Sequence, residues 1–346
     1  MSLSADLILN TIRNESSKMY QDRIPQVNAD NLGQVGKMLL SSENEQYLNH
    51  FIDTLINRIA FTQVIGRMYE NPLKKLKKNG VPFGSTIQEI FVNPSKDMPI
   101  EKAENGKYLL KTTTPDTKVA YYGLSRMSRY PITINESDLE LAFTNNTEFM
   151  SFYTRIMQSM YNGDEIDEYL LSVNLMGKVI DEGAMHIIET DISNPKEVSK
   201  AMSNMSKDFQ FPKGLYNGYN LVNADKISAG ETECITHCPK KNQVLILQAT
   251  AETEITYEFL ANAFNLDLVT LQNMTILVDN IPSEKYDVYG ILMDEQAYQL
   301  RDKLYKVKKQ EIGSELQWNF WLHHWQIQYI SMFGNCVAFA KTKEKQ

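Results

Sequence analysis

The stretch Gln317-Trp318-Asn319-Phe320-Trp321-Leu322-His323-His324-Trp325-Gln326 contains all three tryptophans of a chain of 346 residues. The apolar run from Ile327 to Phe339 follows it directly. A large aromatic side chain buries about 150–250 Å², and a chain terminus frays unless it is tied to the core. A chain that places its largest side chains here must anchor this end. We therefore expect residues 317–339 to form two long strands that complete the fold.

The length and composition indicate a globular protein of two or three compact units, at about 150 residues per domain. Hydrophobic residues make up 42% of the chain. No stretch approaches the ~18 consecutive apolar residues of a membrane span. The first residues carry neither a basic segment nor an apolar segment of a signal peptide, so we do not expect secretion by that route. The three cysteines, Cys234, Cys238 and Cys336, are an odd, low number that indicates a reducing compartment.

The net charge of −8 and the isoelectric point of about 5.3 exclude a protein that grips nucleic acid over its whole surface. Proteins, including further copies of this chain, are the expected partners. The 18 tyrosines are consistent with extensive protein contacts, although a large core needs them equally.

The N-terminal part divides into two predicted segments. Residues 1–41 are polar and rich in Asn and Ser, which predicts an extended arm with one short helix. Residues 42–61 are predicted to form an amphipathic helix, because Leu48, Phe51, Ile52 and Leu55 recur at helical spacing.

Residues 71–130 are punctuated by proline between short β-like pieces, and they predict a long hydrophilic hairpin. The pieces are Thr86–Val92, Lys107–Thr113 and Lys118–Ser125, with a charged tip between Lys96 and Lys107. An isolated hairpin is marginally stable in water. We therefore expect this hairpin to lie on a neighbouring subunit and to be ordered only when another copy lies beneath it.

Residues 147–181 lack proline and carry one apolar stripe at helical period. They predict a helical rod of about 50 Å, at ~1.5 Å per residue, with Gly163 as the position where it bends or divides. The acidic cluster Asp164-Glu165-x-Asp167-Glu168 could bind a hard cation. Because the stripe runs through Ile166 and Tyr169, we favour the solvated face of the helix for these carboxylates.

The remaining residues up to 305 alternate short strands and helices, which predicts a compact α/β or α+β unit over about 200–305. The expected helices are 195–208, which Asn194-Pro195 begins, Tyr257–Phe264 and Glu295–Leu304. The expected strands are Val244–Leu247, Met274–Val278 and Tyr289–Met293.

The sequence contains no phosphate-binding glycine loop, no His-Glu-x-x-His helix and no G-x-S-x-G turn. The segment Cys234-Ile235-Thr236-His237-Cys238 has metal-capable side chains, but a structural zinc site needs four ligands, usually in two pairs. Cys336 is a lone further candidate, and His323 and His324 point to opposite faces of a strand. We therefore expect an ordinary loop, and no catalytic, cofactor-binding or metal-binding residues.

Two clusters could contact nucleic acid. The basic run Lys74-Lys75-x-Lys77-Lys78 could bind phosphates, and the tryptophans could stack on bases. The acidic chain favours a solvated or subunit-facing role for the lysines. The tryptophans are expected on a strand next to an apolar run, which favours a place in the core or in an interface over base stacking.

Several segments together resemble one family, the major capsid proteins of phi-29-like small podoviruses. The segment Asn71–Lys78, followed by Val81–Ile90, resembles the entry into the extended loop of that family. The segments Trp318–Trp321, His324–Gln326 and Phe333–Phe339 resemble its closing strands. Further matches in the same order are Ile12–Asn14, Asp167–Tyr169 and Leu260–Asn265. The resemblance covers about residues 7–340.

The resemblance implies an α+β fold of the tailed-phage major capsid type, the Hong Kong 97 type, with an N-arm, an E-loop, a P-domain that carries a long spine helix, and an A-domain. The expected parts are an N-terminal arm and helix (1–70), an E-loop region (71–130), a P-domain with the spine helix (131–199), an A-domain (200–310) and C-terminal strands that return to the P-domain (311–346). The arm, hairpin, long helix and mixed unit expected from the residues alone have the same order.

The implied function is that of a structural head protein, not an enzyme, that self-assembles into the shell enclosing phage DNA. The resemblance implies pentamers and hexamers of the chain, a scaffolding protein and a portal as partners, DNA contact without specific binding, and no membrane or cofactor. It places the protein in the virion after assembly in the host bacterial cytoplasm. The candidate inter-subunit contacts are Lys74, Lys75, Lys96, Asp97, Glu101, Lys102, Glu104 and Lys107.

Two other functions stay open from the residues alone. A cytosolic enzyme would need titratable residues that converge in one pocket of the 200–305 unit, and the sequence displays no such constellation. A nucleic-acid-binding module that uses Lys74–Lys78 and the tryptophans would show steep salt dependence of DNA binding.

Overall fold

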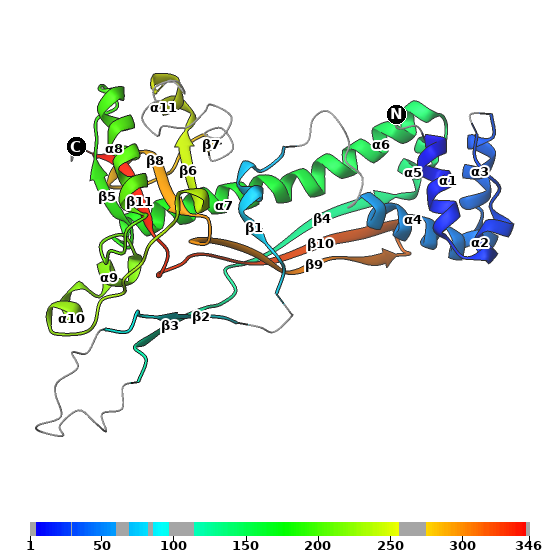
Figure 1. Ribbon diagram of the computed structural model, residues 1–346. Helices are drawn as coiled ribbons and strands as arrows, with labels where there is room; N and C mark the ends of the chain where they lie inside the picture. The colour runs from blue at the N-terminus through cyan, green and yellow to red at the C-terminus, as the bar shows by residue number, and fades with distance from the viewer. Residues whose placement is uncertain are drawn as a thin grey trace, which may run out of the picture. The chain divides into compact units, whose positions relative to one another are not determined.

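The computed structural model describes residues 5–28, 30–59, 69–81, 86–96, 114–255 and 275–343 (Figure 1). The chain forms two compact units. Unit 1 comprises Met1–Asn71, Met127–Glu168 and Leu304–Trp325, and unit 2 comprises Pro72–Arg126, Tyr169–Lys303 and Gln326–Gln346. Helix α7 (Asn162–Asp181) and strands β9 (Tyr298–Ile312) and β10 (Gln317–Ile330) contribute residues to both units.

Unit 1 combines helices with strands around one apolar core. Its helices are α1 (Ala5–Glu15), α2 (Lys18–Arg23), α3 (Leu32–Leu39), α4 (Glu45–Ile59), α5 (Glu136–Ala142), α6 (Asn146–Ile156) and the first part of α7. Strand β4 (Arg126–Asn135) belongs to the sheet of order β1-β9-β10-β4. Phe51 of α4, Phe149 of α6 and Phe320 of β10 are fully buried in the core of this unit.

The N-terminal residues form three helices, so the predicted extended arm with one short helix is wrong. In α1 the buried residues Ala5, Ile8, Leu9 and Ile12 lie on one face, which packs into the core of unit 1. The side chain of Arg13 donates hydrogen bonds to the carbonyl groups of Ile24 and Gln21, at 2.7 Å each. This short apolar face, supported by tertiary contacts, stabilises helices that the polar composition did not indicate.

Two helix predictions for unit 1 are confirmed with adjusted bounds. The helix expected over 42–61 is α4, preceded by a 3-10 turn at Ser42–Asn44. The long helix expected over 147–181 consists of α6 and α7 in sequence (Figure 1), with a π-helical turn at Met157–Tyr161 between them. The irregularity therefore precedes Gly163, where a bend or division was expected.

Unit 2 contains a five-stranded sheet in the order β5-β11-β8-β6-β7. The strands are β5 (His186–Glu189), β6 (Gln243–Gln248), β7 (Thr275–Val278), β8 (Tyr286–Asp294) and β11 (Cys336–Thr342). Strand β8 pairs antiparallel with β6 and with β11, whereas β5 pairs parallel with β11. Leu245, Leu292 and Phe339 from three of these strands are fully buried in the core of this unit.

The helices of unit 2, besides the second part of α7, are short apart from α8. They are α8 (Pro195–Asp208), α9 (Gly218–Val222), α10 (Ala224–Ser228) and α11 (Ala249–Glu254), with 3-10 turns at Pro72–Leu76 and Lys240–Asn242. The predicted helix 195–208 and the three predicted strands of this region are confirmed. The predicted helix Tyr257–Phe264 lies outside the described residues.

The helix predicted at Glu295–Leu304 is wrong, because most of it belongs to the 15-residue strand β9. Tyr298, Gln299 and Leu300 are consecutive and all buried, as in a strand with both faces covered. The short strand β1 (Lys77–Lys78) pairs parallel with β9 at Leu300 and Arg301.

Strands β2 (Ile87–Val92) and β3 (Thr117–Tyr122) form a separate antiparallel ribbon (Figure 1). Its register runs from Ile87 opposite Tyr122 to Val92 opposite Thr117. The predicted pieces Thr86–Val92 and Lys118–Ser125 are therefore confirmed as strands, and Lys107–Thr113 lies outside the described residues. Among the helices that the structure describes, none has the length and apolar composition to cross a lipid bilayer.

Candidate assembly interface

The ribbon of β2 and β3 has two chemically different faces, because successive side chains of a strand point to opposite sides. One face carries Ile90, Val92, Val119 and Tyr121, which are 60%, 54%, 42% and 68% exposed. Ile90 and Val119 lie directly opposite each other in the register. We call these four residues the outward ribbon face. Contiguous exposed apolar residues of this kind mark interaction surfaces.

The other face of the ribbon is anchored on unit 2 itself. The ring of Tyr122 stacks on that of Tyr329, with ring centroids 3.6 Å apart. The Glu89 carboxylate accepts hydrogen bonds from the hydroxyl groups of Tyr329 at 2.9 Å and of Ser331 at 2.7 Å. Burial raises the pKa of Tyr122 to about 12, and burial together with the Glu89 charge raises the pKa of Tyr329. The described part of the ribbon thus rests on its own unit, contrary to the expectation that another copy is needed to order it.

A loop of unit 2 holds the ribbon at the end where Val92 pairs with Thr117. The amide of Asn93 donates to the carbonyl of Glu233 at 3.0 Å and accepts from the backbone N–H of Ile235 at 3.1 Å. The ammonium of Lys118 binds the carboxylate of Glu231 at 2.8 Å. This bond raises the pKa of Lys118 and lowers the pKa of Glu231. Residues 231–235, which include the start of the cysteine-containing segment, therefore position the ribbon.

The cysteines of that segment are buried thiols. Cys234, Cys238 and Cys336 are free of disulfide bonds and buried. Burial raises the pKa of Cys234 to about 11 and also raises the pKa values of the other two thiols. Metal binding and nucleophilic chemistry both require the thiolate, which this environment disfavours.

The structure describes three of the eight predicted contact residues. Lys74, Lys75 and Lys96 are exposed. Their neighbours in the basic run are engaged within unit 2, since Lys77 lies 3.0 Å from Asp302 and Lys78 lies 2.9 Å from Glu295. The predicted contacts outside the described residues are Asp97, Glu101, Lys102, Glu104 and Lys107. All eight stay predictions.

The tryptophan-rich segment forms strand β10 with strict alternation of burial. Trp318 is buried in unit 1, and its indole N–H donates to the side-chain oxygen of Asn49 at 3.0 Å. Trp321 and Trp325 lie on the opposite face and are half-buried. His324 is buried and His323 is half-buried, which confirms that they point to opposite faces of a strand.

Two acidic residues of α7 are buried in unit 1, so the predicted solvated face is wrong for them. Asp164 is 4% exposed and Glu168 is 2% exposed. The Nδ1 atom of His324 lies 2.7 and 2.8 Å from the two carboxylate oxygens of Asp164. Glu168 accepts a hydrogen bond from the amide of Asn71 at 3.1 Å. His324 on β10 and Asn71 on a loop are the polar partners that compensate for the free-energy cost of burying these carboxylates.

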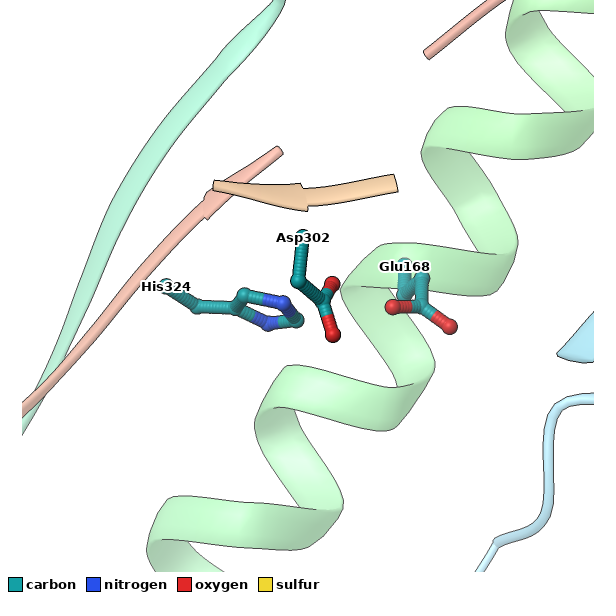
Figure 2. Close-up of side chains that lie close together, drawn as sticks. All are labelled: Glu168, Asp302 and His324. Carbon is teal, nitrogen blue, oxygen red and sulfur yellow. The ribbon is translucent and has the colours of Figure 1, made fainter. Parts of the chain in front are cut away.

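Figure 2 shows Glu168 on α7 and His324 on β10. Each offers a ligand atom within 4.8 Å of the other. Asp302, also labelled there, belongs to unit 2, where it accepts a hydrogen bond from the amide of Gln326 at 2.9 Å. Local spacing could not identify these partners, because residues far apart in the chain supply them.

Solved structures with similar folds include two from phage particles. A capsid structure of Staphylococcus phage Andhra has a TM-score of 0.65 and 11% sequence identity, and the match covers 82% of this chain and 87% of that chain. A structure of the head fibre and inner core protein of native bacteriophage P68 has a TM-score of 0.59 and 14% identity, with 81% and 86% coverage. The class is therefore the α+β coat fold of tailed phages, the Hong Kong 97 type.

Sequence comparison identifies the family within that class. The chain is 28% identical to the major capsid protein of Bacillus phage B103, over 96% of this chain and 72% of the relative. It is 26% identical to the major capsid protein of Streptococcus phage Cp-1, over 95% of this chain and 92% of the relative. Residues 9–340 match the family described as Phi29-like phage major capsid protein, and the chain belongs to this family. It is a structural protein of the virion, whose copies assemble into a multimeric capsid shell.

Proposed function

We propose that copies of this chain form pentamers and hexamers that tile a closed shell around phage DNA, with the E-loop of one copy (about residues 85–125) lying across a neighbour. Heterologous contacts build a closed assembly when the rotation from each subunit to the next returns to the first subunit. Many weak contacts per subunit add cooperatively, as linked binding events do. The A-domain, about residues 200–310, surrounds the fivefold and sixfold axes in this arrangement.

The outward ribbon face is the observation that carries this proposal. Its four apolar side chains are exposed, while the opposite face of the same two strands is anchored on unit 2 by Tyr122 and Glu89. A ribbon held in this way presents its apolar face outward at low cost in conformational entropy, because one side is already ordered. In a protein that assembles into a shell, a neighbouring copy is the partner that covers this face.

The remaining parts of the proposal concern partners and location. A scaffolding protein and a portal take part in assembly in the host bacterial cytoplasm, and the packaged DNA contacts the shell without specific binding. The net charge of −8 supports weak contact, because an acidic inner wall repels the phosphate backbone. A basic inner surface of the mature shell would contradict this point. The chain acts as a structural protein and not as an enzyme, and an active site in the 200–305 unit has no support.

Negative-stain electron microscopy of the expressed chain, alone and with the scaffolding protein of the same phage, tests the proposal. We expect the wild-type chain to form shells. We expect the double variant Ile90→Ser/Val119→Ser to form none. The exposed Thr117 of the same ribbon provides the matched control Thr117→Ser, which should assemble normally. Circular dichroism of the subunits checks that each variant is folded. Normal shells from the folded double variant would contradict the role of the outward ribbon face.

A further inference from the structure

The loop that follows strand β1 in unit 2 contains an exposed Asn-Gly pair, Asn79-Gly80. We propose that Asn79 is a site of spontaneous deamidation, which converts this asparagine into aspartate and isoaspartate without an enzyme. The modification goes beyond the assembly function, because it requires only the chain itself and water. It adds one negative charge to each modified copy, next to the pairing of β1 with β9.

The reaction takes place between the backbone of one residue and the side chain of its neighbour. The backbone nitrogen of Gly80 attacks the side-chain carbonyl carbon of Asn79 and closes a five-membered succinimide. The side-chain nitrogen leaves as ammonia, together with the proton of the Gly80 amide. Water then opens the ring: cleavage at the side-chain carbonyl gives aspartate, and cleavage at the backbone carbonyl gives isoaspartate. Glycine favours ring closure because it has no Cβ atom to obstruct the approach of its nitrogen.

Both reacting groups are free of hydrogen bonds to the residues that the structure describes. Arg301 donates a hydrogen bond to the backbone carbonyl of Asn79 at 3.2 Å, and the side chain of Asn79 has no such partner. The N–H of Gly80 has no acceptor there either, whereas the next N–H, of Val81, donates to the carbonyl of Asp302 at 2.9 Å. The attack therefore breaks no existing hydrogen bond of either group.

Two other Asn-Gly pairs in the described part of the chain are held in place. In Asn162-Gly163, at the start of α7, the asparagine side-chain oxygen accepts the backbone N–H of Tyr69 at 2.8 Å. In Asn217-Gly218 the asparagine is fully buried. Its side-chain oxygen accepts the N–H of Asn220 at 2.9 Å, and its side-chain nitrogen donates to the carbonyl of Cys234 at 3.0 Å. Ring closure at either pair has to break these bonds, so the fold protects both and leaves Asn79 reactive.

The modification disturbs the pairing of β1 with β9. The hydrogen bonds from Arg301 to Asn79 and from Val81 to Asp302 lie on either side of the reacting peptide bond. A Cβ atom at Gly80 would lie 2.9 Å from the carbonyl oxygen of Asp302, so the backbone is packed closely against β9 at this point. Isoaspartate inserts an additional carbon atom into the backbone before Gly80. It therefore displaces Gly80 and Val81 and weakens the bond to Asp302.

Peptide mass spectrometry of the full-length chain, stored for weeks in neutral buffer, tests the site. We expect Asn79 to be deamidated at least about tenfold faster than Asn162 and Asn217 in the folded protein. In guanidinium chloride the three should react at similar rates, because the unfolded chain protects none of them. The pair Asn105-Gly106, outside the described residues, lies on a separate peptide. Reaction of Asn79 as slow as that of the two protected asparagines in the folded protein would overturn the proposal.

The variant Asn79→Gln provides the matched control, since glutamine would have to close a six-membered ring, which forms far more slowly. Amide hydrogen exchange of residues 77–81 is the second readout. In stored wild-type protein that carries isoaspartate we expect exchange of the Val81 N–H to be at least about fivefold faster than in fresh protein. Stored Asn79→Gln should match fresh protein. Unchanged exchange in the modified wild type would overturn the effect on β1. Both measurements use the chain before assembly, so failure of the shell proposal would leave their outcome unaffected.

Discussion

The acidic residues of α7 show what helical spacing can and cannot predict about single side chains. Spacing correctly grouped Asp164 and Glu168 on one face of the helix. It could not say which face points inward, because apolar residues occur on both sides. Ile166 and Leu170 are 37% and 46% exposed, whereas the two acidic residues are buried. The inward direction depends on His324 and Asn71, which lie far away in the sequence.

Replacement of Asp164 by Ala should lower the free energy of unfolding by about 3 kcal/mol, because it removes the acidic partner of a buried hydrogen-bonded histidine. Asp167 lies on the same helix but is exposed and accepts one hydrogen bond, from the hydroxyl of Tyr130 at 2.7 Å. The control variant Asp167→Ala should therefore cost under about 1 kcal/mol. Urea denaturation of dissociated subunits measures both values. Equal losses would show that the buried pair contributes no more than the exposed bond.

Two glycines of α7 give a second matched pair at the residue scale. A Cβ atom at Gly177 would lie 1.5 Å from the carbonyl oxygen of Pro282, whereas one at Gly163 would meet only the ring of Tyr130 at 3.7 Å. Alanine is favoured over glycine in a helix by about 1 kcal/mol. We expect Gly163→Ala to raise the melting temperature of the subunit. Gly177→Ala should lower it, because a backbone carbonyl cannot move aside cheaply. Differential scanning calorimetry decides the sign of each effect.

At the scale of elements, the need to bury large aromatic side chains correctly predicted a strand, whereas one local helix prediction was wrong. Strand β10 was predicted because its large aromatic residues have to be buried, and its alternation of burial is evident in the structure. The segment Glu295–Leu304 was predicted as a helix, and it contains the good helix formers Glu, Gln, Ala, Leu and Lys. It is part of β9 because the sheet of order β1-β9-β10-β4 places this strand between two others. Such long-range pairing cannot be deduced from a local window of sequence.

The ribbon offers an element-scale prediction based on two neighbouring tyrosines that point to opposite faces. Tyr122 stacks on Tyr329, whereas Tyr121 is 68% exposed on the outward ribbon face. Tyr122→Ala should loosen the ribbon from unit 2, and limited proteolysis of the dissociated subunit should then cleave residues 86–122 several-fold faster. Tyr121→Ala should leave that cleavage rate unchanged. Unchanged cleavage in Tyr122→Ala would show that the hydrogen bonds of Glu89 and Asn93 anchor the ribbon without this stack.

For the whole molecule, the residues alone indicated the order of the parts, and the resemblance indicated the fold. The hairpin, the long helix and the mixed unit all occur in the predicted order. The division into two units was not predictable in full, because three of its five boundaries fall inside α7, β9 and β10, where no proline, glycine or change of composition marks them. The packing of helices α1, α2 and α3 was missed for a related reason, since those helices depend on the core formed with α4 and α6.

Several carboxylates of unit 2 have lowered pKa values, and each of them makes the folded molecule less stable as the pH falls. The ammonium of Lys213 at 2.7 Å and the hydroxyl of Tyr216 at 2.9 Å bind Asp208, and these bonds hold its pKa below the usual 3.8. Lys341 and Ser193 lower the pKa of Asp191, and Lys118 and Tyr219 lower that of Glu231. Each folded-state pKa lies below the unfolded value. The stabilisation is therefore present above the unfolded pKa and is lost as the pH falls through the folded pKa.

Unit 2 should accordingly lose thermal stability progressively below about pH 4.5 and show little change from pH 5 to 7. The variant Asp208→Asn lacks the carboxylate charge at every pH. Its melting temperature should therefore be lower than that of the wild type at pH 7, and it should fall less steeply than the wild-type value between pH 4.5 and 2.5. The variant Asp225→Asn, at an exposed carboxylate of α10, should keep the wild-type slope. Calorimetry across this pH range measures the slopes. A wild-type slope in Asp208→Asn would mean that acid acts through other carboxylates, and a melting temperature that rises on acidification would reverse the sign of the linkage.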